Sequence, residues 1–351
     1  MKKRLLSLAL SMLLVMLCWS PASASGTRTI VDCAGDTVEV PEKVETVINL
    51  VAYGCQAMAA LNLGDYLVGI NDDNTIESQW IVEMYPRITE IEAYDVETSA
   101  EILLKSGADV VIVENPAQAK ELRAKGVTAV TFTYFTMDEV RYAYRMLGEL
   151  LGGEAQVKCN AYVDYLDNNI ARVADAMEGK LERRETLYYI NGVSNKGLYK
   201  TTGKGSTNWA EAELSYTDYA TSGLIDTSTS YVDAEAILAV NPENIIIGGR
   251  WQHVLYDTLM ASPEWESNTA VVNGHVFKVP MGISAWNRYG IEIALMIPWT
   301  TWVVYPEIFD FDPVQETKDF YQQFTGYSLS DEQVNYILNG LTPQGEKEIA
   351  N

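Results

Sequence analysis

The segment Glu101-Ile-Leu-Leu104, followed by Asp109-Val-Val-Ile-Val113, has a counterpart later in the chain, Glu235-Ala-Ile-Leu238 followed by Glu243-Asn-Ile-Ile-Ile247. The two copies align without a gap: an acid, apolar residues two and three positions on, a second acid eight positions on, and a β-rich run. Each copy predicts a short helix that leads into a buried core strand. We therefore expect two halves built on one plan.

Strand and helix patterns alternate through the first half of the chain. The stretch from Thr29 to Val40 alternates apolar and polar residues around Gly35-Asp36, which predicts a hairpin. Further strands are predicted at 44–51, 67–70, 109–113 and 128–133, with helices at 56–63, 100–105, 117–125 and 137–151. Strands joined by helices form mostly parallel sheets. The pattern predicts an α/β lobe over residues 25–152.

A long helix is predicted between the two halves. Apolar residues recur at helical spacing from Glu154 to about Lys180, and a helix of about 27 residues is about 40 Å long. The βα pattern then restarts, with strands predicted at 186–190, 244–247 and 275–279 and helices within 231–240, 291–304 and 314–324. We expect a connecting helix over 153–181, a second α/β lobe over 182–300, and helices over 301–351 that pack across both lobes. The predicted fold is thus two Rossmann-like lobes with mostly parallel sheets, joined by a single long helix, with a cleft between them.

The first 24 residues have the pattern of an export signal. A basic start at residues 2–4 precedes an apolar run from Leu5 to Leu17, and Ala22-Ser23-Ala24 has the small residues of a cleavage site. We predict a signal peptide over 1–24 and a periplasmic protein. Cys18 leaves a second route open, because lipoproteins are cut before a Cys, although Leu17 stands where a small residue is wanted. If Cys18 is lipidated, the protein is anchored at the outer face of the membrane.

Charge and composition exclude several classes of function. The net charge is −23, and it becomes −26 without the three basic residues at positions 2–4. Nucleic-acid binding needs a basic stripe, and none is visible. No segment after residue 24 has the roughly 18 consecutive apolar residues of a membrane span. Three cysteines remain, Cys33, Cys55 and Cys159. We expect buried free thiols, with a Cys33–Cys55 disulfide as the alternative.

Motifs of enzyme chemistry are missing from the sequence. There is no G-x-S-x-G, no H-E-x-x-H and no G-x-G-x-x-G after a strand. The segment from Gly197 to Gly205 resembles a phosphate-binding loop, but it has one residue too many and Gly205 replaces the hydroxyl residue. Only His253 and His275 are histidines, so a metal site of three histidines is excluded. We expect a binding protein rather than an enzyme, and an exported enzyme is the weakest alternative.

The loops after the predicted strands carry the candidate ligand-binding residues, because ligands of open α/β sheets bind beyond the carboxyl ends of the strands. Arg250 and Arg288 each follow such a strand and stand beside aromatic residues. Arginine offers fixed donors to anionic groups, and aromatic rings stack on flat ligands. The alternative is that both arginines pair with surface acids while the tryptophans fill the core. The candidates are Tyr53, Asn115, Tyr134, Trp209, Arg250, Trp251, His253, Trp286, Arg288 and Tyr289.

Three features together resemble a known protein family. They are the opening segment from Thr29 to Pro41 with its continuation to Leu50, the paired Glu101 and Glu235 units, and the C-terminal pattern from Trp299 to Ser330. The chain resembles the solute-binding proteins of ABC importers for iron-siderophores, haem and vitamin B12, whose lobes are joined by a single helix. The resemblance spans essentially the whole chain after the signal segment.

This resemblance implies a partner and a docking mode. In the family, one glutamate on each lobe docks onto arginines of the membrane permease, which works with an ATPase. The matching positions are Glu101 and Glu235, which the internal repeat had already paired. Acids at helix N-termini that interact with the helix dipole are the structural alternative, and it applies equally to Glu97 or Asp233. The resemblance further implies a monomer without an intrinsic cofactor.

The ligand is expected to be a ferric siderophore or haem, because the predicted cleft loops are rich in aromatic residues. The segment Ala285-Trp-Asn-Arg-Tyr289 is similar to a subgroup of the family in which some members bind molybdate or tungstate, and this oxyanion function is the first alternative. Cobalamin is the second. If a ferric ion is bound directly, Tyr53, Tyr134 and His253 are the candidate ligands.

Overall fold

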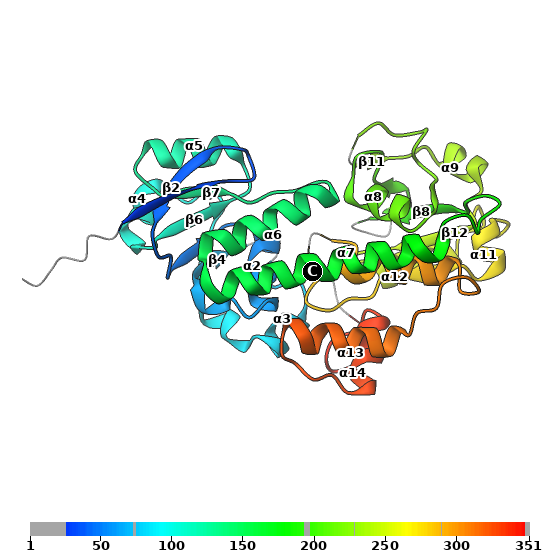
Figure 1. Ribbon diagram of the computed structural model, residues 1–351. Coiled ribbons are helices and arrows are strands. Elements are labelled where there is room, and N and C mark those ends of the chain that lie inside the picture. Colours follow the sequence, from blue (N-terminus) through cyan, green and yellow to red (C-terminus); the bar gives the residue numbers. More distant parts are fainter. Residues whose placement is uncertain (1–25, 73–74, 193–196, 228, 289, 348–351) are drawn as a thin grey trace, which may run out of the picture.

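The computed structural model describes residues 26–72, 75–192, 197–227, 229–288 and 290–347. Two parallel sheets lie at opposite ends of the molecule, and helix α7 (Gly153–Met177) runs between them (Figure 1). The predicted class, α/β with mostly parallel sheets, is confirmed. The predicted signal peptide, Cys18 and Tyr289 lie outside the described residues. Within the described ranges, no helix is both long and apolar enough to cross a membrane.

The first lobe is built on a five-stranded parallel sheet in the order β5-β4-β3-β6-β7. Its strands β3 and β6 are buried along their whole length, as expected for central strands covered by helices on both faces. The sheet strands are β3 (Val47–Asn49), β4 (Leu67–Asn71), β5 (Glu92–Tyr94), β6 (Val110–Val113) and β7 (Ala129–Thr131). The helices are α2 (Ala52–Ala60), α3 (Gln79–Met84), α4 (Ala100–Ser106), α5 (Pro116–Ala124) and α6 (Met137–Leu151), with 3-10 turns η1 (Gly64–Tyr66) and η2 (Pro86–Glu90).

The second lobe has a four-stranded parallel sheet in the order β10-β8-β12-β13. Its strands are β8 (Thr186–Ile190), β10 (Asp218–Tyr219), β12 (Asn244–Ile247) and β13 (Val276–Lys278), and β9 (Lys200–Thr201) pairs with β11 (Ser230–Tyr231) in a separate ribbon. Its helices are η3 (Gly197–Tyr199), α8 (Thr207–Leu214), α9 (Ala234–Val240), α10 (Gln252–Met260) and α11 (Thr269–Asn273). Thus β8 and β12 occupy the central places that β3 and β6 occupy in the first lobe.

The internal repeat is confirmed down to individual hydrogen bonds. In the first lobe, the Thr46 N–H donates to Asp109 Oδ2 at 2.9 Å, and the Asp109 N–H donates to Thr46 Oγ1 at 3.0 Å. In the second lobe, the Thr186 N–H donates to Glu243 Oε2 at 3.0 Å, and the Glu243 N–H donates to Thr186 Oγ1 at 2.9 Å. In both lobes, therefore, the repeat's second acid joins the start of one central strand to the start of its neighbour.

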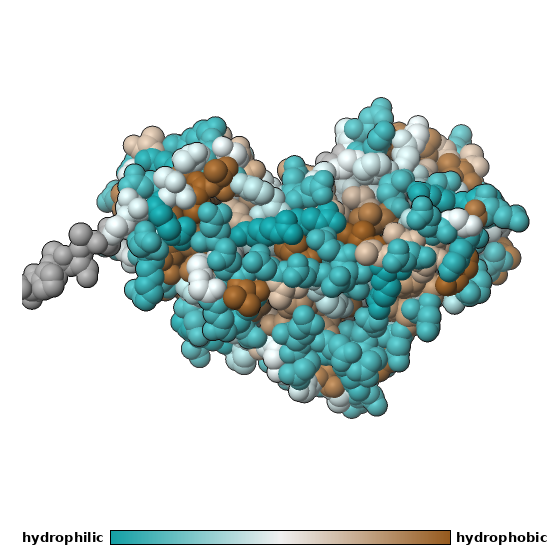
Figure 2. Space-filling model, in the orientation of Figure 1, coloured by the Kyte–Doolittle hydropathy of each residue, from teal (hydrophilic) through white to brown (hydrophobic). Residues whose placement is uncertain are grey.

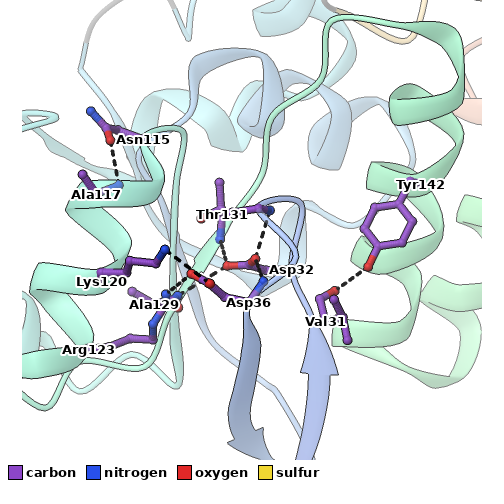
Figure 3. A network of polar contacts seen from close by, with 11 residues as sticks. Val31, Asp32, Asp36, Asn115, Ala117, Lys120, Arg123, Ala129, Thr131 and Tyr142 are labelled. Atoms are coloured by element: carbon purple, nitrogen blue, oxygen red, sulfur yellow. Dashed lines mark hydrogen bonds and ion pairs between the residues drawn. The ribbon is translucent and has the colours of Figure 1, made fainter.

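The N-terminal hairpin of β1 (Thr27–Val31) and β2 (Thr37–Pro41) is fixed to the first lobe by a buried carboxylate. Asp32 is fully buried and accepts hydrogen bonds from the backbone N–H groups of Ala34, Asp36 and Thr131, each at 3.0 Å (Figure 3). Arg123 of α5 reaches both Asp32 and Asp36. A buried charge with this many donors is stabilised rather than strained, so the polar cluster has a structural role.

Helix α7 links the lobes and ends earlier than the sequence pattern predicts. It folds back along α6 and packs on α12 (Ile293–Val304), where Asn169 Nδ2 donates to the carbonyl of Ala294 at 2.8 Å. The prediction carried the helix to about residue 180, but the helix stops at Met177 because Gly179 takes a left-handed backbone with φ of 70°. Helix α7 is therefore held between α6 on one side of its course and α12 further along it.

The C-terminal helices α13 (Pro313–Phe324) and α14 (Asp331–Leu338) contact both lobes. On the first-lobe side, Asn62 donates to the carbonyl of Phe324, and Trp80 Nε1 donates to the carbonyl of Leu341 at 2.8 Å. On the second-lobe side, the Met281 N–H donates to the carbonyl of Ile337 at 2.9 Å. These contacts add a second connection between the lobes beside α7.

Cys33, Cys55 and Cys159 are free thiols, so the alternative of a Cys33–Cys55 disulfide is wrong for this structure. Burial raises the pKa of each thiol to about 12. Such thiols are protonated at neutral pH and are poor nucleophiles and metal ligands.

Candidate functional site

A hollow separates the two lobes on the upper side of the molecule (Figure 2). Helix α6 begins beside this hollow, directly after the loop that leaves the carboxyl end of β7 (Figure 1). Since ligands of parallel sheets bind at the carboxyl ends of strands, the loops at this edge form the candidate site.

The first lobe contributes a cavity of about 730 Å³ at the carboxyl ends of β5, β6 and β7. Phe135, with half of its surface exposed, provides an aromatic wall, and Asn115 caps α5 by accepting from the Ala117 N–H at 2.8 Å. The described lining includes three acids and no basic residue. It consists of Val96, Glu97, Glu114, Asn115, Pro116, Ala117, Gln118, Glu121, Thr133 and Phe135.

Tyr53 and Tyr134 lie together beside this cavity, with ring centroids 5.3 Å apart. The half-buried Tyr53 hydroxyl donates toward Glu114 Oε1 and the carbonyl of Phe132, both at 3.3 Å. Tyr134 is almost fully buried and packs edge-on against Phe132. Tyr53 therefore remains a candidate for ligand contact, whereas Tyr134 supports it from below.

Three loops of the second lobe converge at the carboxyl ends of β8 and β12. Asn287 Nδ2 donates to Asn191 Oδ1 at 2.9 Å, which joins the loop after β8 to the loop after β13. A Cβ placed on Gly248 would lie 2.3 Å from the Asn287 side chain, so only glycine allows this approach. The loop that carries Arg250 and the loop that carries Arg288 are thereby held side by side.

Arg288 contacts the opposite lobe. The Arg288 guanidinium lies over Gly249, the residue that precedes the half-buried Arg250 in the chain. The Nε of Arg288 is 3.7 Å from Glu77 Oε1. The Arg288 side chain is 51% exposed, whereas the Glu77 side chain is only 9% exposed. The pairing with an acid that the sequence analysis held as an alternative is thus found for Arg288, but the acid is a buried one on the other lobe.

The structure buries three of the predicted ligand-binding residues. Trp286 is fully buried in the core, and Tyr134 is 1% exposed, so neither ring presents a surface to a ligand. His253 is buried on α10, where its Nε2 donates to the carbonyl of Gly340 at 2.8 Å, and burial lowers its pKa. Sequence position after a strand did not separate these core-facing side chains from loop side chains that face solvent.

Trp209 and Trp251 are half-buried and keep some exposed ring surface. Trp209 lies on α8 against the main core, and Trp251 precedes α10 against the core of the second lobe. Among the described residues, no group of three or more His, Cys, Asp or Glu side chains is arranged to hold a metal ion. Of the three candidate ferric ligands, Tyr53 and Tyr134 lie together on the first lobe, whereas His253 lies on α10 of the second lobe with its Nε2 donating to the carbonyl of Gly340.

A buried carboxylate that the sequence analysis missed organises the loop of Arg288. Glu292 is fully buried; it accepts from the Ser284 N–H at 3.1 Å and from the Tyr321 hydroxyl at 3.1 Å. Burial raises its pKa to about 7. Glu292 is the only charged residue between positions 289 and 306, a sequence signal that marks it as unusual. The local sequence around Glu77 does not mark it in the same way, because its partner, Arg288, lies far away in the chain.

The two candidate docking acids occupy equivalent places. Glu101 and Glu235 are exposed and stand in the first turn of α4 and α9, which are both seven residues long. Both helices end in a left-handed residue, Gly107 and Asn241 respectively. The helices lie on opposite lobes (Figure 1).

The chain is similar to known binding proteins over most of its length. It is 23% identical over 268 residues to the uncharacterized ABC transporter substrate-binding lipoprotein YvrC of Bacillus subtilis, which covers 70% of this chain and 81% of that protein. A periplasmic solute binding protein from Veillonella parvula has a TM-score of 0.77 at 22% identity, covering 91% of this chain and 99% of that one.

Two further structures share the fold. The molybdate periplasmic binding protein MolA of Haemophilus influenzae has a TM-score of 0.74 at 20% identity, with 86% of this chain and 99% of that chain covered. CeuE of Helicobacter pylori, solved with Ni(II) bound, has a TM-score of 0.69 at 19% identity, with 89% and 99% covered. Residues 35–281 match the family described as periplasmic binding protein, and the chain therefore belongs to that family.

Proposed function

We propose that this protein is the solute-binding component of an ABC importer, that it captures a ferric siderophore or haem between its lobes, and that it delivers this ligand to a permease outside the cytoplasmic membrane. Family membership and the similarity to an ABC transporter substrate-binding lipoprotein support the transport role. The signal-peptide pattern supports export, and lipidation at Cys18 is the route to a membrane-anchored form.

The aromatic surface at the strand-exit loops carries the proposal of a large, flat ligand. Phe135 is 51% exposed beside the first-lobe cavity, and Tyr53, Trp209 and Trp251 are partly exposed. Aromatic faces bind planar chelates through stacking, and a cavity of about 730 Å³ exceeds what a tetrahedral oxyanion needs. A molybdate or tungstate function is the second candidate, favoured by the similarity in fold to MolA.

A thermal-shift screen of the mature protein tests the function. Binding to the native state alone adds about 2.7 kcal/mol of stability when the ligand is at 100 times its Kd. We expect a rise in Tm with ferric siderophores or haem. A rise with cobalamin, molybdate or tungstate alone would replace the proposed ligand. Turnover of an ester or phosphate substrate, with no rise in Tm for any of these ligands, would contradict the transport role.

Variants of the second-lobe arginines locate the ligand. We expect Arg288→Ala and Arg250→Ala each to weaken binding of the ligand found in the screen by at least about ten-fold, and Arg→Lys to restore it only in part, because an ammonium group cannot reproduce the planar fork of donors. Arg145→Ala, which removes an exposed arginine from α6, is the matched control and should bind normally. Unchanged affinity in both test variants would place the ligand elsewhere.

A further inference from the structure

The ion pair between Glu77 and Arg288 brings together charges from the two lobes at the candidate site. Glu77 lies between β4 and α3 of the first lobe, while Arg288 lies in the loop that precedes α12. Its Nε is 3.7 Å from Glu77 Oε1, a distance that gives ionic attraction without a hydrogen bond. The acid is 9% exposed and the arginine 51% exposed, so Arg288 extends into solvent from a fixed, buried counter-charge.

Such a counter-charge changes what Arg288 can bind. A carboxylate within about 4–6 Å of a binding anion repels it, and at a sheltered position salt screens this repulsion poorly. Compact dianions are affected most, because all of their charge lies close to the pair. A large chelate spreads a lower charge over many atoms and makes much of its contact with apolar surface.

The first-lobe side of the site also repels compact anions. Glu97, Glu114 and Glu121 line the cavity, and no described residue of its lining is basic. The Tyr53 hydroxyl beside the cavity already donates toward one of these acids, Glu114, at 3.3 Å. The positive charge that attracts a dianion is thus supplied by the second lobe, and one of its arginines, Arg288, is already faced by Glu77 of the first lobe.

We propose that Glu77 is a specificity-determining residue, which weakens the binding of compact dianions at Arg288 and leaves the site selective for a large ligand of low charge density. This inference rests on the proposed function of the inter-lobe site. It predicts that wild-type protein discriminates against molybdate, sulfate and similar oxyanions, even though the fold is shared with a molybdate-binding protein.

The test is calorimetric titration with sodium molybdate at low salt. Glu77→Gln keeps the shape of the side chain and removes its charge, so we expect it to bind molybdate at least about ten-fold more tightly than wild type. Glu77→Ala should show the same gain and guards against an effect peculiar to glutamine. Glu90→Gln removes an exposed acid from the same lobe and should leave the affinity unchanged. The double variant Glu77→Gln with Arg288→Ala should return to the wild-type level.

Two results would overturn the inference: molybdate affinity in both folded Glu77 variants no greater than in wild type, or a gain that persists in the double variant. Circular dichroism and Tm establish that each variant is folded. The proposed function is tested by a separate measurement, in which ligand binding to wild type is followed by tryptophan fluorescence. It is wrong if wild type binds neither ferric siderophore nor haem. A gain of molybdate binding in Glu77→Gln would still assign the charge effect to Glu77 in that case.

Discussion

At the candidate site, buried carboxylates fix the position of Arg288: Glu292 holds its loop, and Glu77 faces its side chain. Glu292 lies beneath the loop of Arg288 and holds Ser284 through both its N–H and its hydroxyl group. A Cβ on Gly290 would lie 2.8 Å from Glu292 Oε2, so the loop is closely fitted around the acid. The position of Arg288 therefore depends on a group whose pKa burial has raised to about 7.

Glu292→Gln tests this dependence through pH. A carboxyl whose pKa is raised on folding stabilises the protein below its unfolded pKa of about 4.3, and this contribution is lost as the pH rises through 7. Glutamine cannot ionise, so we expect the stability of Glu292→Gln relative to wild type to increase by about 3 kcal/mol between pH 4 and pH 8.

Urea unfolding of both proteins at several pH values measures this difference. The neighbouring phenols do not interfere, because burial and the charge of Glu292 hold the pKa of Tyr144, Tyr162 and Tyr321 well above the usual value. Parallel pH profiles of the two proteins would show that Glu292 does not titrate in this range.

At the scale of helices and strands, the repeat places a threonine and an acid at the same point in both lobes. The pKa of Glu243 is lowered to about 2, because Arg183 and Thr186 hydrogen-bond to its charged form. The first-lobe copy differs in one detail: the Asp109 N–H also donates to the Thr46 carbonyl at 3.1 Å. The two copies should therefore respond differently to the loss of the hydroxyl group.

We expect Thr186→Val to lower the free energy of unfolding by about 1–2 kcal/mol, because it leaves the Glu243 N–H without its hydroxyl acceptor. Thr46→Val should cost about half as much, since the Asp109 N–H keeps the Thr46 carbonyl. Thr258→Val, at an exposed hydroxyl on α10, is the control and should change stability by less than about 0.5 kcal/mol. Chemical denaturation followed by circular dichroism gives the values, and equal losses at Thr46 and Thr186 would contradict the stated difference.

Regular elements were predictable from the sequence where local pattern determines them. The strands at 186–190 and 244–247 agree to the residue, because each is a β-rich run with clear boundaries. Helices α8, α10 and α14 were missed, since their short apolar patterns are weak and tertiary contacts stabilise them. The site was predictable only as a set of loops. Whether Trp286 or His253 faces a ligand depends on packing against distant segments, and the Glu77–Arg288 pair joins residues more than 200 positions apart.

At the scale of the whole molecule, the proposed delivery of a ligand depends on how the protein docks on its permease. Glu101 and Glu235 are exposed, occupy equivalent first-turn positions, and lie one on each lobe. Paired contacts of this kind would make docking sensitive to the distance between the lobes, and hence to whether a ligand holds them together. Exposed acids can be removed with little effect on folding, because no buried partner is left behind.

We therefore expect Glu101→Ala combined with Glu235→Ala to abolish uptake of the ferric ligand in cells that carry the cognate permease, with ligand affinity and Tm unchanged. Each single variant should retain part of the uptake, because one lobe can still dock. The matched control is Glu90→Ala combined with Glu266→Ala, which removes one exposed acid from each lobe away from α4 and α9 and should transport normally. Radioactive-iron uptake measures all four variants against wild type. Normal uptake by the Glu101 and Glu235 double variant would refute the docking role, whereas an equal loss in the control would assign the effect to net charge, since screened surface charges act together on association.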